Sequence, residues 1–81
     1  MPPKPQHSRR YRPVPALLRQ FREDAGLTQR QLAEILGEPQ PWVHYCETGS
    51  RRVDVAEFVA WAEACSVAPT TALRRFLAAS K

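Results

Sequence analysis

The sequence predicts an all-α fold in which five short helices form one small domain. Apolar residues recur at helical spacing in each segment from residue 15 onward, and no segment alternates polar and apolar residues over the length of a strand. Three glycines and eight prolines divide the chain into segments of helical length. A chain of 81 residues can bury only a small core, so we expect a compact bundle.

The first 14 residues are predicted to be a disordered basic arm, outside a domain that spans residues 15–81. The arm is rich in proline, poor in apolar side chains and free of acidic residues. Its four basic side chains equal the formal net charge of +4 of the whole chain: Lys4, Arg9, Arg10 and Arg12. The remaining residues hold eight basic and eight acidic groups. The domain must therefore attract a polyanion by where its charges lie, not by their total.

The first two predicted helices have start and stop signals of their own. One runs from Pro15, whose fixed φ suits a first helical turn, to Gly26, which suits a left-handed C-cap. Its apolar residues are Leu17, Leu18, Phe21 and Ala25. The next begins with a capping box of Thr28 and Gln31 and ends at Gly37. Its apolar residues are Leu32, Ala33, Ile35 and Leu36.

The third and fourth predicted helices are delimited in the same way. Pro39-Gln40-Pro41 opens the third, because proline is tolerated only in a first turn, and Gly49 closes it. Its inward stripe is Val43, Cys46 and Glu47. Asp54 caps the fourth, which ends near Cys65. Its apolar residues are Val55, Phe58, Val59, Trp61 and Ala62.

The fifth predicted helix begins at Pro69 or Thr70 and has an apolar stripe of Leu73, Phe76 and Leu77. This stripe has two interpretations. It covers the core of its own domain, or part of it pairs two copies of the chain. An 81-residue monomer has little room to bury two large side chains so close to its end, which favours some role in pairing.

Several function classes find no support in the sequence. Cys46 and Cys65 are too few for a disulfide scaffold, and no segment resembles a signal peptide or a membrane span, so we expect free thiols in a cytoplasmic protein. His44 and Cys46 lie two positions apart on a helix, where side chains diverge by roughly 200°, so we expect no metal site. No phosphate loop, catalytic triad or paired-carboxylate pocket is suggested. We therefore predict neither an enzyme nor a bound cofactor or small-molecule substrate.

Residues 26–54 carry the most informative pattern. A tight turn at Gly37-Glu38 separates two short helices, which lets the second cross the first and project one face outward. The chain resembles the lambda-repressor-like, Xre-type helix-turn-helix family of transcriptional regulators over about residues 15–68. The matching positions are Arg22, Gly26-Leu27-Thr28-Gln29, Leu32-Ala33, Leu36-Gly37, Pro39-Gln40, Val43, Glu47-x-Gly49, Arg51-Arg52 and Val53-Asp54-Val55.

This resemblance implies a sequence-specific DNA-binding regulator of bacterial or phage origin, acting at the nucleoid. A repressor or autoregulator is the expected kind, in a phage, a mobile element or a toxin–antitoxin system. The expected partner is double-stranded DNA with a palindromic operator, bound by a homodimer, because relatives generally occupy two-fold sites. The alternative is a protein-interaction module on the same scaffold, such as an antitoxin or anti-activator subunit. Pro41 and Trp42 on the recognition face give that alternative its weight.

The resemblance also assigns site residues. The residues expected to contact bases are Gln40, Pro41, Trp42, His44 and Tyr45. Gln40 resembles a glutamine that pairs with N6 and N7 of adenine. Trp42 has a second interpretation, as a partly buried cover on the preceding helix. The residues expected to contact the DNA backbone are Thr28, Gln29, Arg30, Arg51 and Arg52.

Two further expectations concern charge. The resemblance implies an ion pair between Arg22 and Glu47 that ties the third helix to the first. The basic arm either follows the DNA backbone or enters a minor groove, or it serves only to keep the protein soluble.

Overall fold

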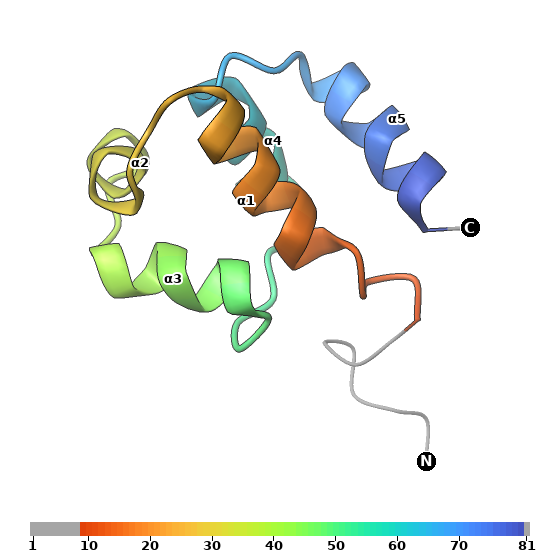
Figure 1. Cartoon of the computed structure of the whole chain (residues 1–81), viewed down its shortest axis with the longest axis horizontal. Coiled ribbons are helices and arrows are strands. Elements are labelled where there is room, and N and C mark those ends of the chain that lie inside the picture. Colours follow the sequence, from red (N-terminus) through yellow and green to blue (C-terminus); the bar gives the residue numbers. More distant parts are fainter. Residues whose placement is uncertain (1–8, 81) are drawn as a thin grey trace.

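The structure, a computed structural model, describes residues 9–80, and this part of the chain consists of five helices joined by short loops (Figure 1). The helices are α1 (Val14–Asp24), α2 (Gln29–Leu36), α3 (Gln40–Thr48), α4 (Val55–Ala64) and α5 (Pro69–Ala79). Residues 9–80 contain no strand. The predicted all-α fold, the number of helices and their order are confirmed.

Two capping boxes set the starts of α2 and α4. Thr28 Oγ1 accepts a hydrogen bond from the N–H of Gln31 at 3.1 Å, and Gln31 Oε1 accepts one from the N–H of Thr28 at 2.9 Å. Asp54 and Glu57 exchange the same pair of bonds, at 2.7 and 2.9 Å. Each box satisfies two N–H groups that a helix N-terminus leaves without partners. The sequence predicted the Thr28 box in full but only the Asp54 half of the second.

The turn between α2 and α3 is built on Gly37. Its φ of +71° lies in the left-handed region, which L-residues with a Cβ adopt only with strain. The next residue, Glu38, donates its N–H to the carbonyl of Ala33 at 3.0 Å and so closes the end of α2. Pro39 is extended, and α3 then leaves in a new direction. This turn places α3 across the end of the bundle, as Figure 1 shows.

The core gathers side chains from all five helices. Eight of its side chains are fully buried: Leu18, Phe21, Leu32, Val43, Cys46, Trp61, Ala62 and Ala72. Trp61 is the largest, and its indole N–H donates to the carbonyl of Leu18 at 3.0 Å, which satisfies the polar end of a buried ring. Val55, which the sequence placed on the apolar side of α4, is instead 79% exposed. Val55 is the first residue of α4, and its side chain does not reach the core.

The ordered domain begins before residue 15. Tyr11 and Val14 are buried, and the Tyr11 hydroxyl accepts a hydrogen bond from the N–H of Val53 at 2.9 Å. The expectation that the disordered arm extends to residue 14 is therefore wrong for residues 9–14, because one aromatic ring and one valine find apolar surface beside the loop that precedes α4. Residues 1–8, the rest of the expected arm, lie outside the described residues.

Helix α5 only partly covers the core. Ala72 is fully buried and Phe76 packs against the core at its edge. Leu73 and Leu77 are 50% and 48% exposed, so the predicted apolar stripe is divided between core and surface. Within residues 9–80, no helix has both the length and the apolar character that crossing a bilayer requires.

Candidate nucleic-acid interface

Helix α3 has a buried side and a projecting side. It buries Val43, Cys46 and Glu47 as the sequence predicted. Its opposite side exposes Pro41, His44, Tyr45 and Thr48. The His44 and Tyr45 rings meet edge to face, with centroids 5.8 Å apart. This exposed face has no charged side chain, and its imidazole and hydroxyl groups can both donate and accept hydrogen bonds.

Thr48 is the residue of this face that the sequence analysis missed. It lies four positions after His44, so helical spacing places both on one side, and that spacing was the available signal. Its hydroxyl lies 3.3 Å from the carbonyl oxygen of Tyr45 and 3.3 Å from the hydroxyl of Ser50.

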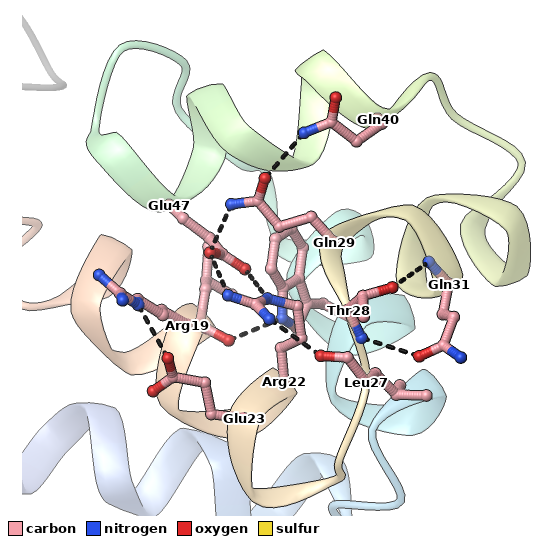
Figure 2. Close-up of polar contacts among 11 residues, drawn as sticks. Arg19, Arg22, Glu23, Leu27, Thr28, Gln29, Gln31, Gln40 and Glu47 are labelled. Atoms are coloured by element: carbon pink, nitrogen blue, oxygen red, sulfur yellow. Dashed lines mark hydrogen bonds and ion pairs between the residues drawn. The ribbon is translucent and has the colours of Figure 1, made fainter.

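Gln40 is half-buried at the edge of the exposed face, and its orientation is fixed from behind. Its Nε2 donates to Gln29 Oε1 at 2.8 Å, and Gln29 Nε2 donates to Glu47 Oε1 at 3.0 Å (Figure 2). An ionised carboxylate can only accept hydrogen bonds, so Gln29 must turn its N–H groups toward Glu47 and its oxygen toward Gln40. Gln40 must then donate, and its own carbonyl oxygen points away from Gln29 (Figure 2).

An ion pair inside the domain anchors this chain of bonds. Arg22 Nε and Nη2 donate to the two oxygens of Glu47 at 2.6 and 3.0 Å, and Arg22 Nη1 donates to the carbonyl of Leu27 at 2.9 Å. The side chains of Arg22 and Glu47 are 11% and 2% exposed. The hydrogen bond to Glu47 raises the pKa of Arg22. The structure thus contains the expected ion pair between α1 and α3.

Trp42 does not belong to the exposed face. Its ring is half-buried against the core and lies 6.1 Å from the ring of Trp61, measured between centroids. The guanidinium of Arg51 lies over the Trp42 ring, 4.9 Å from its centroid. Of the two interpretations of Trp42, the structure supports the partly buried cover, with α4 rather than α2 supplying the ring beneath it. The Trp42 ring packs against Trp61 and keeps part of its surface exposed, and contact of Trp42 with bases stays a prediction.

Arg51 is held in the loop after α3. Its Nη1 and Nη2 donate to the two oxygens of Glu57 at 3.2 and 3.1 Å, and Nη1 also donates to the carbonyl of Arg52 at 2.9 Å. The hydrogen bonds from Arg51 are the main reason that the pKa of Glu57 is lowered. Arg51, expected to contact the DNA backbone, therefore braces Trp42 of α3 against the N-terminus of α4.

The other residues expected at the DNA backbone lie at the start of α2 and in the loop after α3. Thr28 caps α2, and Gln29 is half-buried behind Gln40. Arg30 follows Gln29 on α2 and is exposed. Arg52 is exposed in the loop after the C-terminal end of α3, with its guanidinium 4.4 Å from the ring centroid of Tyr11. An exposed arginine thus follows the C-terminal end of the uncharged face.

The two cysteines are buried free thiols, and burial raises the pKa of each to about 11. Among the residues that the structure describes, no three His, Cys, Asp or Glu side chains gather as ligands of one metal ion.

Comparisons with known proteins agree with this geometry. A family model described as a helix-turn-helix domain matches residues 16–77. A solved structure, an XRE-family like protein from Pseudomonas syringae pv. tomato str. DC3000, is 36% identical in sequence and superposes with a TM-score of 0.79. The match covers 89% of this chain and 88% of that one. No curated protein compared with the chain matches it.

Proposed function

Because this chain belongs to the Xre-type helix-turn-helix family of DNA-binding regulators, we propose that it is a sequence-specific transcriptional regulator that reads the major groove with α3. One observation carries the proposal. An uncharged face of α3 projects from the domain, its first polar residue, Gln40, is oriented by a hydrogen bond to Gln29, and the exposed Arg52 follows its C-terminal end. An uncharged polar face can form hydrogen bonds with base edges, and arginines beside it can bind phosphates. Occupying an operator would block or recruit polymerase, and repression or autoregulation is the role we favour.

Gln40 is the residue we assign to adenine. Its outward carbonyl oxygen suits the N6 amino group, and its second N–H suits N7. His44, Tyr45 and Thr48 follow on the same face and can bond neighbouring base edges, while Pro41 offers apolar contact to a thymine methyl. Arg30 and Arg52 are assigned to phosphates, where they position the domain without reading sequence.

We further propose that two copies bind a palindromic operator through α5. The half-exposed Leu73 and Leu77 support this contact, because they give one helix two large apolar side chains at the surface. A two-fold contact there would hold two α3 helices about 34–36 Å apart, one turn of DNA. Sedimentation with the Leu73→Gln/Leu77→Gln variant tests it, with Ile35→Gln, which replaces a 56% exposed residue of α2, as the control. A wild-type monomer that binds as one copy per operator would contradict it.

The protein-interaction module is the weaker candidate. Its support is the absence of net charge in residues 15–81 together with Pro41 and Trp42 on the recognition face. Trp42 packs against Trp61, and the guanidinium of Arg51 lies over its ring. Less of the Trp42 ring is therefore left for a protein partner to contact beside Pro41.

Binding of the chain to the DNA that flanks its own gene, measured by fluorescence anisotropy, tests the proposal. Gln40→Ala should cost about 1–3 kcal/mol at the preferred site and relax the preference at one base pair. Gln20→Ala, an exposed glutamine of α1, is the matched control and should bind as the wild type does. The assignment of Gln40 is wrong if its variant ranks single-base operator changes in the same order as the wild type.

A further inference from the structure

The segment before α1 is anchored to the loop that follows the recognition helix. Tyr11 is 7% exposed, and its hydroxyl accepts the N–H of Val53. Its ring also carries the guanidinium of Arg52, 4.4 Å from the centroid. Figure 1 shows the segment before α1 and the loop after α3 at the same end of α1. Residues 9–13 are therefore docked beside the C-terminal end of α3.

This docking gathers positive charge. Arg9, Arg10 and Arg12 are exposed on either side of the buried Tyr11, and Arg52 lies on its ring; we call these four residues the arginine cluster. The other described residues hold six basic and eight acidic side chains. The cluster thus turns an otherwise acidic domain into a basic one. Arg52 brings it to the loop that follows α3, while Arg9 and Arg12 line a hollow with Ala79 and Ser80 at the end of α5.

We propose that the arginine cluster is a docked clamp for the DNA backbone, which binds phosphates beyond the C-terminal end of α3. This inference rests on the proposed function, because α3 must lie in the major groove for the loop after it to face the phosphates that border the groove. Tyr11 holds the backbone of residues 9–13 in place. The arginines of this segment therefore lose less conformational entropy on binding DNA than the arginines of a flexible arm would. The contact adds affinity for any DNA sequence and leaves the reading of bases to α3.

The salt dependence of DNA binding tests this clamp. Each phosphate contact steepens the slope of log K against log salt by about 0.9, so Arg9→Gln/Arg10→Gln/Arg12→Gln should make the slope shallower by about 2.7. Between 50 and 200 mM salt the wild type should then lose about 40-fold more affinity than the variant. The control, Arg19→Gln/Arg74→Gln, removes two exposed arginines, one of α1 and one of α5, and should keep close to the wild-type slope.

A footprint of the operator locates the contact. Hydroxyl-radical protection should be lost in the triple variant only where each half-site meets the C-terminal end of α3, and Arg52→Gln should weaken the same positions. Wild-type binding together with an unchanged slope and footprint in the triple variant would overturn the clamp and leave the proposed function standing. Absence of wild-type binding to any DNA would overturn both.

Discussion

Replacing Arg22 with alanine breaks the buried ion pair between α1 and α3. The substitution leaves the Glu47 carboxylate, 2% exposed, with Gln29 as its remaining side-chain donor. It also removes the bond from Arg22 to the carbonyl of Leu27 in the loop between α1 and α2. The charge that remains is buried beside α3, so the variant should lose both stability and the fixed position of the recognition helix.

The magnitude follows from the burial of the pair. Breaking a largely buried ion pair by removing one partner costs about 3–5 kcal/mol, because the other charge stays buried without compensation. A domain of this length has a free energy of unfolding of about 4–12 kcal/mol, from roughly 0.05–0.15 kcal/mol per residue. Each kcal/mol shifts the Tm of such a domain by about 4–8 °C, so Arg22→Ala should lower the Tm by at least about 12 °C.

Thermal and urea unfolding, followed by circular dichroism, measure the loss. Arg19→Ala is the matched control, since Arg19 pairs with Glu23 on the surface of the same helix with side chains 62% and 46% exposed. That change should cost no more than about 0.5 kcal/mol. The double variant Arg22→Met/Glu47→Leu should recover much of the stability, because it leaves no buried charge behind. Equal, small effects of the two alanine variants would refute the reasoning.

Three further outcomes are expected. Cys46 and Cys65 should react with a thiol reagent at pH 8 only as fast as the domain unfolds, because both side chains are buried out of reach of the reagent and burial also raises their pKa to about 11; rapid reaction of the native protein would contradict this. The lowered pKa of Glu57, caused mainly by Arg51, means that its stabilising contribution is complete above its ordinary value of 4.5 and is lost as the pH falls through the lowered pKa. Urea titrations from pH 6 to pH 3 should therefore show a steeper loss of stability for the wild type than for Glu57→Gln, and parallel curves would count against the pair. Gly37→Ala should cost about 1–2 kcal/mol in unfolding free energy, since a Cβ meets nothing within 4 Å but φ is +71°, and a variant as stable as the wild type would show that the turn relaxes.

The helices could be predicted from sequence because their signals are local. The Thr28–Gln31 capping box and the glycine that ends α2 lie within ten residues of each other, and each specifies one end of a helix. The Arg22–Glu47 pair, 25 positions apart, could not be predicted from spacing and came from the resemblance to the family. The place of Thr48 on the exposed face of α3 could have been predicted from the helical period alone.

Contacts between side chains that lie far apart in the chain could not be predicted from the sequence. Tyr11 sits in a polar, proline-rich segment, and its hydrogen bond reaches a backbone group 42 positions away. Trp42 on α3 and Arg51 in the loop after it are surface candidates from sequence alone. Only the positions of Trp61 and Glu57 on α4 give Trp42 a ring to pack against and Arg51 a carboxylate to bind. Such contacts depend on how helices cross, which no single segment encodes.

The hydrogen-bonded glutamines behind α3 also constrain how operator preference can diverge or be redesigned. A substitution that removes the Gln40 amide leaves Gln29 Oε1 without the hydrogen bond that Gln40 Nε2 donates, while Gln29 Nε2 keeps its bond to Glu47. Mutational paths toward a new target therefore pass most easily through paired changes at positions 29 and 40. A combinatorial library that randomises both positions should yield folded variants with altered preference more often than one that varies position 40 alone.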